Sequence, residues 1–316
     1  MADAKQRYAV VTGSNKGIGL ETVKGLASNG VKVVLTARDE KRGYEALKKL
    51  KEFGLSEFVI FHKLDVTDSA SVASLVEFVK VQFGRLDILV NNAGITGFNT
   101  DDLVSGHFFP TLCGDIGLYN ASKRNTVSYT LMQVGSKINW RELPQTYEMA
   151  KKCLTTNYYG AKETTKAFLP LLQQSNSPHI VNVSSTAGLL KHISNEWAKG
   201  VLDDTENLTE ERIEKVLKEF MKDFKEGSLK NKGWPTYLST YMVSKAALNT
   251  YTRLLAKNHQ NFCINCVCPG FVKTDINRNT GILSVENGAA SVVRLALLPN
   301  GSPSGNFFAR QEVSGF

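Results

Sequence analysis

The chain has 316 residues, of which 42% are hydrophobic and 22% are charged, and its formal net charge is +8 at pH 7. This is the composition of a globular protein, and no apolar run is long enough to cross a membrane. Basic residues are mixed with acidic ones along the chain, so we expect a surface that attracts an anionic small molecule, and no nucleic-acid partner. Residues 1–7 lack the apolar core of a signal peptide, which predicts a cytoplasmic protein.

Residues 8–38 have the pattern of a strand, a glycine-rich turn, a helix and a second strand. The turn carries Gly13, Gly17 and Gly19, and glycine allows a sharp bend and a close approach of backbone N–H groups to a ligand. A unit of this kind directs a helix N-terminus, with its partial positive charge, at a phosphate group. The alternative is a tight turn that binds nothing.

Strands and helices go on alternating as far as residue 94. The expected strands span 57–62 and 86–90, and the expected helices span 39–53 and 69–83. Alternation of this kind predicts one α/β domain with a doubly wound parallel sheet, in which ligands bind beyond the carboxyl ends of the strands. Gly13, Asp65 and Asn91 each follow such an end, so we expect all three on one rim.

Two inserted segments interrupt the alternation. Residues 95–143 are polar and without a clear period, which indicates an inserted subdomain or a partly mobile segment. Residues 186–235 contain a helix that begins at the N-cap Thr209 and carries one apolar stripe, formed by Ile213, Val216, Leu217, Phe220, Met221 and Phe224. The stripe packs against the main domain, shapes a substrate pocket, or does both.

The C-terminal half resumes the helix and strand patterns. The expected helices span 145–174, 237–257 and 284–298, and the expected strands span 178–183, 262–268 and 307–309. Cys263, Cys266 and Cys268 have a spacing that suggests a metal cluster. However, they lie in a strand-like run without a second cysteine pair or a histidine cluster, so we interpret them as buried side chains and predict no metal.

Five motifs follow one another in the order found in short-chain dehydrogenases/reductases. They are Thr12-Gly-x-x-x-Gly17-x-Gly19, Asn91-Asn-Ala-Gly94, Asn182-Val-Ser-Ser185, Tyr241-Met-Val-Ser-Lys245 and Pro269-Gly270. The chain resembles this family over nearly its whole length, which implies a single Rossmann domain over residues 1–316 whose two insertions form a lid. The insertions resemble those of the plant monomeric branch, the branch of salutaridine reductase and the menthone reductases.

Tyr241 and Lys245 are four residues apart, so they share one face of a helix. A phenol has an ordinary pKa of about 10, and we expect a nearby ammonium to lower the pKa of Tyr241 so that the phenol can give a proton to a carbonyl oxygen. The resemblance implies that Lys245 also holds the nicotinamide ribose and that Ser185 donates a hydrogen bond to the developing alkoxide. It further implies that Asn157 relays protons to Lys245 through water.

A second Tyr-x-x-x-Lys pattern occurs at Tyr119 and Lys123. It precedes the strand that ends at Ser185, and it falls in the first insertion, where no core helix is expected. Tyr241 follows that strand, as the family order requires. We therefore assign the pattern at Tyr119 to chance.

The choice of cofactor depends on the end of the second strand, where enzymes that use NAD carry an acid for the ribose 2′-hydroxyl. Ala37 occupies that position, and Lys16 and Arg38 could clamp a 2′-phosphate, which predicts NADPH. A shift of two positions would instead bring Asp39 to the ribose.

The remaining cofactor contacts follow from the resemblance. Asp65 with Val66 resembles the pair that contacts the adenine, although Asp65 could instead cap the next helix, a role that Asp68 fills better. Thr274 resembles the threonine that holds the carboxamide and phosphate side. The full predicted set is Gly13, Asn15, Lys16, Gly17, Ile18, Gly19, Arg38, Asp65, Val66, Asn92, Ala93, Gly94, Tyr241, Lys245, Pro269, Gly270, Val272 and Thr274.

The resemblance implies NADPH-dependent reduction of a bulky cyclic terpenoid or alkaloid ketone to a secondary alcohol. In the plant branch the ketone reductases have a tyrosine at the position of Tyr241, whereas isopiperitenone reductase has a glutamate there and reduces a C=C bond. The alternatives are a C=C (enone) reductase and a non-catalytic cofactor-binding regulator. The first insertion is placed to cover a helix that oligomeric relatives use for pairing, which predicts a monomer.

Overall fold

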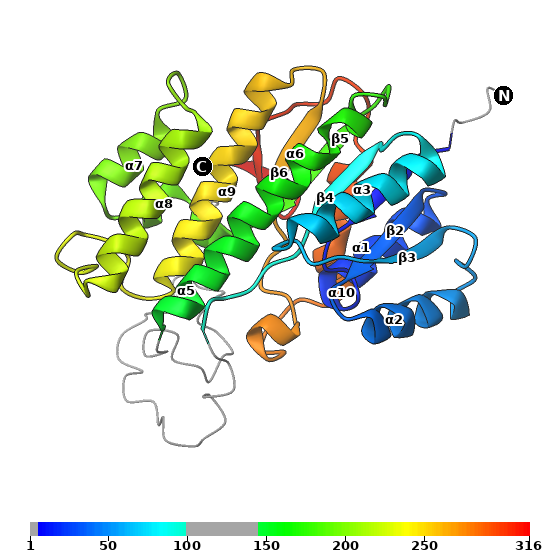
Figure 1. The fold of residues 1–316 in the computed structure, drawn as a ribbon, viewed down its shortest axis with the longest axis horizontal. Coiled ribbons are helices and arrows are strands. Elements are labelled where there is room, and N and C mark those ends of the chain that lie inside the picture. Colours follow the sequence, from blue (N-terminus) through cyan, green and yellow to red (C-terminus); the bar gives the residue numbers. More distant parts are fainter. Residues whose placement is uncertain (1–5, 99–144) are drawn as a thin grey trace, which may run out of the picture.

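The computed structural model describes residues 6–98 and 145–316, and these form a sheet with helices on both faces (Figure 1). Within these residues the strand order is β3-β2-β1-β4-β5-β6-β7-β8. Every neighbouring pair is parallel except β7 and β8, which are antiparallel. The predicted doubly wound parallel sheet is confirmed.

The elements lie where the sequence predicts them, with ends that differ by a few residues. The strands are β1 (Tyr8–Val11), β2 (Lys32–Ala37), β3 (Val59–Lys63), β4 (Ile88–Asn91), β5 (His179–Val183), β6 (Cys263–Cys268), β7 (Phe307–Ala309) and β8 (Glu312–Ser314). The helices are α1 (Gly17–Ser28), α2 (Glu40–Glu52), α3 (Ser69–Phe83), α5 (Tyr147–Leu154), α6 (Ala161–Leu172), α7 (Glu196–Asp203), α8 (Glu210–Lys225), α9 (Ser239–Asn258) and α10 (Val285–Ala296). Two of these elements, α7 and β8, were not predicted.

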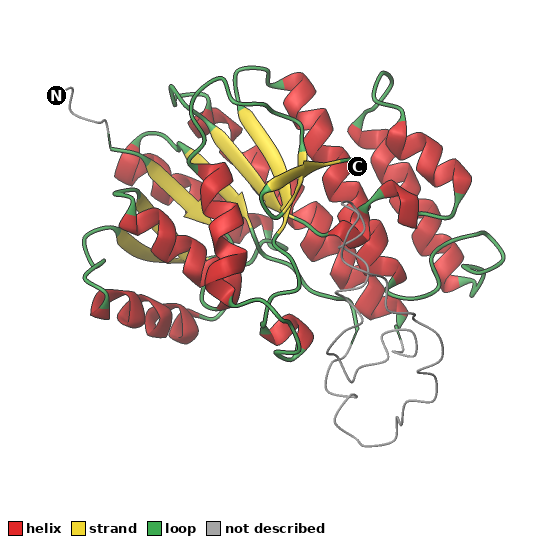
Figure 2. Ribbon diagram, turned by 180° about the vertical axis from the view of Figure 1, so that it is seen from behind, coloured by secondary structure: helices red, strands yellow, loops and turns green. Residues whose placement is uncertain are grey.

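Side chains on the central strands point alternately into two apolar clusters. In β1, Val10 belongs to the cluster with α3, α6 and α9, and Ala9 and Val11 belong to the cluster with α1, α2 and α10. Figure 2 shows the corresponding helices in front of and behind the strands. Because both faces of the sheet are buried, ligands can reach it only at the ends of the strands.

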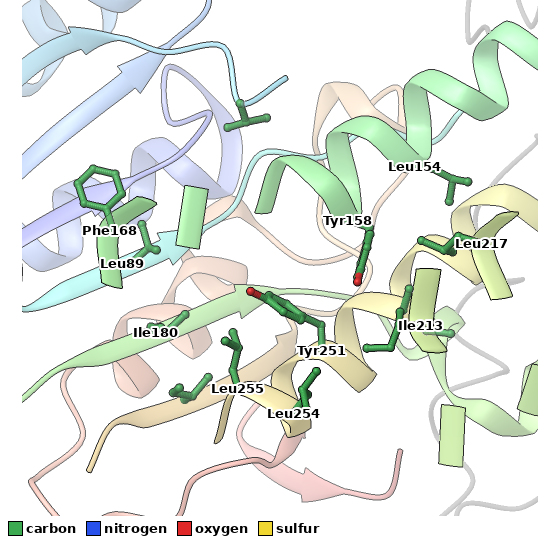
Figure 3. Packing of buried hydrophobic residues seen from close by; sticks show 14 of the residues in the cluster. Leu89, Leu154, Tyr158, Phe168, Ile180, Ile213, Leu217, Tyr251, Leu254 and Leu255 are labelled. Carbon is green, nitrogen blue, oxygen red and sulfur yellow. The ribbon is translucent and has the colours of Figure 1, made fainter. Parts of the chain in front are cut away.

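The second insertion covers the helices of one face. Thr209 caps α8 by accepting a hydrogen bond from the Arg212 N–H, as predicted. Leu217 lies beside Leu154 of α5, and Ile213 lies beside Tyr251 of α9 (Figure 3). Of the two alternatives for the apolar stripe, packing against the main domain is confirmed.

The long helix predicted over 145–174 changes its hydrogen bonding in the middle. Between α5 and α6, Thr155–Gly160 form a π turn, η2, with helical backbone angles on both sides. Such turns insert an extra residue and are frequent at functional sites. Asn157 lies inside this one.

Most of the first insertion, including Tyr119 and Lys123, lies outside the described residues. Across the described ranges, no helix is both long and apolar enough to cross a membrane. The cysteines of β6 are buried, as interpreted from the sequence. The described residues also contain no group of three or more His, Cys, Asp or Glu side chains placed to hold a metal ion.

Candidate active site

A cleft of about 1840 Å³ opens at the carboxyl ends of the strands. The segments that follow β1, β3, β4, β5 and β6 all contribute to its lining. Gly13 and Asp65 line the cleft as predicted, but Asn91 does not. The Asn91 side chain instead donates buried hydrogen bonds to Asn182 Oδ1 (2.8 Å) and Thr165 Oγ1 (2.9 Å), because it ends β4 with its side chain directed into the core.

The glycine turn places the N-terminus of α1 at the cleft. Gly13 and Gly17 have φ values of +60° and +56°, a region that favours glycine. A Cβ on Gly19 would lie 2.5 Å from Asn92 Nδ2 and 2.8 Å from the Gly13 carbonyl oxygen, so only glycine fits there. No side chain caps α1 and its first turn holds no acid, which suits a helix end that meets an anion.

The turn after β4 is fastened to the glycine turn. Asn92 Nδ2 donates to the carbonyl oxygens of Thr12 (2.9 Å) and Gly13 (3.0 Å). Thr12 Oγ1 accepts from the N–H groups of Asn92 (2.9 Å) and Ala93 (3.0 Å). The first strand–helix turn and the Asn-Asn-Ala-Gly motif therefore form one rigid wall of the cleft.

The two cations considered for the 2′-phosphate lie in the cleft lining, whereas the acid that follows β2 does not. Lys16 and Arg38 both line the cleft. Asp39 does not line it, because its carboxylate caps α2 by accepting a hydrogen bond from the Arg42 N–H at 2.9 Å. Beyond the end of β2, Arg38 therefore lines the cleft and Asp39 does not. Lys16 Nζ lies 2.5 Å from Asp275 Oδ2.

Tyr241, Lys245 and Ser185 come together at the inner part of the cleft. The Ser185 side chain lies close enough to the Tyr241 hydroxyl to influence the pKa of the phenol. The buried ammonium of Lys245 lies 5.8 Å from the centre of the Tyr241 ring and donates to the Val183 carbonyl oxygen at 2.9 Å. A Cβ on Gly188 would lie 2.4 Å from the Lys245 carbonyl carbon, so this glycine allows α9 to approach the segment after β5.

Burial dominates the proton affinities of this group. It raises the pKa of Tyr241, an effect to which Cys268 adds and which the Ser185 hydrogen bond opposes. Burial also lowers the pKa of Lys245 to about 8. The pKa of Tyr241, which we predicted to be lowered, is instead raised on balance, because loss of water around the hydroxyl outweighs the other influences. The phenol stays protonated at neutral pH, as a proton donor must be.

Every predicted catalytic and cofactor-binding residue lines the cleft except Asn157. Its amide is engaged with the chain after β4, since Nδ2 donates to the Ile95 carbonyl oxygen (2.8 Å) and Oδ1 accepts from the Ile95 N–H (2.8 Å). Nδ2 also donates to Ser244 Oγ at 3.0 Å. A Cβ on Gly94 would lie 3.4 Å from Asn157 Oδ1 and 3.5 Å from Lys245 Nζ, so the two side chains flank Gly94.

Asp65 folds back on its own turn, with Oδ1 accepting from Thr67 N–H (2.9 Å) and Thr67 Oγ1 (2.7 Å), while Asp68 caps α3 as expected. The other predicted cofactor contacts also border the cleft. They are Asn15, Ile18, Val66, Ala93, Gly94, Pro269, Gly270, Val272 and Thr274.

Sequence reasoning missed the mouth of the cleft. Large apolar side chains that remain exposed line it at Tyr237, Ile276, Ile282 and Val313. Val313 lies in β8, and the hairpin of β7 and β8 contributes residues 309–314. No periodicity marks these positions, since each lies in a short or irregular segment. From the second insertion only Thr186 lines the cleft, so α7 and α8 cover helices and not the site.

Comparisons with known proteins agree with this geometry. A short chain dehydrogenase family model matches residues 7–107, and an Enoyl-(Acyl carrier protein) reductase model matches residues 227–300. The chain is 53% identical over 320 residues to (+)-neomenthol dehydrogenase of Arabidopsis thaliana, with 100% of both chains covered. It belongs to the short-chain dehydrogenase/reductase family.

Other members confirm the resemblance to plant terpenoid and alkaloid reductases. The chain is 48% identical to (-)-isopiperitenone reductase of Mentha piperita over 98% of each chain. The solved structure of salutaridine reductase from Papaver somniferum is 48% identical and has a TM-score of 0.84, covering 96% of this chain and 99% of that one. This short-chain dehydrogenase/reductase is therefore an oxidoreductase with a Rossmann fold, in a family that binds a nicotinamide cofactor.

Gly19→Ala should weaken cofactor binding. The added methyl group would lie 2.5 Å from Asn92 Nδ2, so the wall formed by the two turns must shift. We expect the Kd of NADPH, measured by titration calorimetry, to rise roughly tenfold or more. Gly200→Ala is the matched control because a Cβ there meets nothing within 4 Å. An unchanged Kd in a folded Gly19→Ala protein would show that the turn does not face the cofactor.

Proposed function

We propose that this enzyme uses NADPH to reduce a bulky cyclic ketone, of terpenoid or alkaloid type, to a secondary alcohol. The observation that carries the proposal is the pair of hydroxyls of Ser185 and Tyr241, which lie close together at the cleft, with the Lys245 ammonium 5.8 Å from the centre of the phenol ring. Two hydroxyl donors that converge at one point can both hold a carbonyl oxygen. A ketone oxygen needs such donors, since it gains negative charge during reduction.

The residues have separate roles in the proposed reaction. When bound, NADPH supplies a hydride to the carbonyl carbon. Tyr241 donates its phenolic proton to the carbonyl oxygen, and Ser185 donates a hydrogen bond to the same oxygen as the C=O π electrons move onto it. Lys245 then stabilises the phenolate by its positive charge. Asn157, held against Ile95, supports the wall beside Lys245, and we propose that it aids proton supply to Lys245 through water.

Two features support NADPH as the cofactor. Lys16 and Arg38 offer two cations to a 2′-phosphate at the cleft. Asp39, whose carboxylate would favour a free 2′-hydroxyl, is occupied as the cap of α2. All other residues that we predicted to contact the cofactor line the same cleft.

The apolar mouth supports a large, weakly polar substrate. Tyr237, Ile276, Ile282 and Val313 leave apolar surface exposed around the opening, which a bulky hydrocarbon skeleton would cover. Relatives whose names specify neomenthol and salutaridine support a terpenoid or alkaloid skeleton.

Reduction of a C=C bond is the second candidate, because a relative 48% identical is an isopiperitenone reductase. Ketone reduction is favoured, since a phenol that lies beside Ser185 in the cleft lining can transfer its proton to an oxygen held between them. A non-catalytic regulator would have no need of this arrangement. We also propose that the protein is a monomer, because α8 covers parts of α5 and α9 that could otherwise pair with a second copy.

Replacing the acid tests the proposal directly. Tyr241→Phe keeps the ring and removes the proton that reaches the carbonyl oxygen. We expect ketone turnover to fall by roughly 10²–10⁴-fold with the Kd of NADPH unchanged. Turnover would be followed by NADPH absorbance, with product identification to separate alcohol from saturated ketone. Retained ketone reduction in Tyr241→Phe would exclude Tyr241 as the acid.

Arg38→Ala should weaken the binding of NADPH without weakening the binding of NADH. Loss of a charge-assisted contact to the 2′-phosphate is expected to raise the KM for NADPH by roughly 10–100-fold and to leave the KM for NADH nearly unchanged. Arg42→Ala is the control, since Arg42 lies on α2 outside the cleft lining. Equal changes for both nucleotides would place the 2′-phosphate elsewhere.

The rate of ketone reduction should depend on the protonation of Lys245. Because burial lowers the pKa of Lys245 to about 8, the ammonium is present below that pH and is lost above it. We expect kcat for reduction to be level below about pH 7 and to fall about tenfold per pH unit above about pH 8. In Lys245→Met the residual rate should lack this fall. A profile for Lys245→Met with the same alkaline limb would assign it to another group.

A further inference from the structure

The glycine turn and the segment after β6 touch each other across the cleft. A Cβ on Gly17 would lie 3.4 Å from Thr274 Cγ2, and a Cβ on Gly288 would lie 2.6 Å from Val272 Cγ2 and 3.4 Å from Ile18 Cγ1. The segment that begins with Phe271 is therefore packed against the start of α1. Any group bound at the helix N-terminus must come close to this segment.

One ion pair joins the two walls at this point. Lys16 Nζ lies 2.5 Å from Asp275 Oδ2, although the residues are 259 positions apart in the chain. The side chains are 56% and 62% exposed, so water and salt screen the attraction. Such a pair adds little to the stability of the fold, and a stronger anionic partner for Lys16 can replace Asp275.

The ion pair lies next to the position proposed for the 2′-phosphate. The N–H of Ser14 donates to the Thr36 carbonyl oxygen at 2.8 Å, which holds the glycine turn beside the end of β2. Arg38 follows that end and lines the cleft together with Lys16. A phosphate monoester carries nearly two negative charges at neutral pH. It is attracted to both cations and repelled by the Asp275 carboxylate.

On the basis of the proposed NADPH preference, we propose that Asp275 sets how strong that preference is. Its carboxylate competes with the cofactor 2′-phosphate for the ammonium of Lys16. NADH has a hydroxyl at this position and leaves the ion pair closed, whereas NADPH must break it. Asp275 thus lowers the affinity for NADPH and has little effect on the affinity for NADH.

Affinities of the two nucleotides for the protein without substrate test this inference. We would measure the Kd of NADPH and of NADH by titration calorimetry at low ionic strength for wild type and Asp275→Asn. We expect NADPH to bind roughly two- to fivefold more tightly to Asp275→Asn, the range of an exposed ion pair, and NADH to bind equally well to both. Glu312→Gln is the control, because Glu312 is another exposed acid in the cleft lining, without Lys16 as a partner. It should leave the ratio of the two Kd values unchanged.

Repeating the substitution in a Lys16→Met protein separates two effects of Asp275: competition with the 2′-phosphate for Lys16, and direct repulsion of the 2′-phosphate. In Lys16→Met the ammonium is absent, so adding Asp275→Asn should tighten NADPH by clearly less than in wild type. If Asp275→Asn raised the affinity for NADPH by the same factor with and without Lys16, the proposed competition would be wrong. Weaker binding of both nucleotides to Asp275→Asn would also overturn it, since the pair would then be a clasp that closes over the bound cofactor.

The same titrations distinguish this inference from the cofactor choice. If wild type binds NADPH no more tightly than NADH, the proposed cofactor choice fails, and the role of Asp275 fails with it. If wild type prefers NADPH and the preference is unchanged in Asp275→Asn, only the role of Asp275 is wrong. Circular dichroism would establish that each variant is folded.

Discussion

The site depends on the burial of one ammonium against the carboxyl end of β5. Lys245 is only 5% exposed, and its Nζ donates to the Val183 carbonyl oxygen. A buried charge is costly unless it is hydrogen-bonded, so this contact fixes the position of α9 against the sheet. Gly188 permits the approach, because any side chain there would overlap the backbone of Lys245. Tyr241, one turn earlier on α9, is thereby held beside Ser185.

The second insertion and a buried polar chain hold α9 from its other sides. α8 packs its apolar stripe against α9, and Lys162 of α6 binds Glu214 of α8 at 2.6 Å. On the sheet side, Asn182 accepts from Asn91 (2.8 Å) and donates to Thr252 Oγ1 of α9 (2.9 Å). Buried hydrogen bonds are directional, so they set the register of α9 more strictly than apolar packing alone. The helix that carries Tyr241 and Lys245 is therefore buried on nearly all sides.

The lining of the cleft combines two kinds of surface. The N-terminus of α1 and the cations Lys16 and Arg38 suit phosphate groups. Exposed apolar side chains such as Ile282 and Val313 suit a hydrocarbon. The same lining includes Tyr241 and Ser185. One cavity thus offers electrostatic attraction to a charged group and apolar contact to a hydrocarbon.

The sequence by itself determined the architecture, because strand and helix periods and glycine turns are local patterns. The strand end at Ala37 and the caps Asp68 and Thr209 were predicted correctly for this reason. The family motifs then supplied most of the predicted residues that line the cleft. The exact roles remained out of reach where they depend on surroundings: the pKa of Tyr241 is set by burial, which a spacing of four residues does not reveal.

Only the tertiary structure decided the contacts between distant segments. It brought Asp275 to Lys16, turned Asn157 toward Ile95, and placed Val313 at the mouth of the cleft. It also showed that α8 covers helices while the β7–β8 hairpin borders the site. These positions carry no local signal, because each results from how whole elements pack. The hydrophobic period and the turn residues determine where a helix or strand lies in the chain. Side-chain packing and long-range hydrogen bonds determine which other elements it contacts.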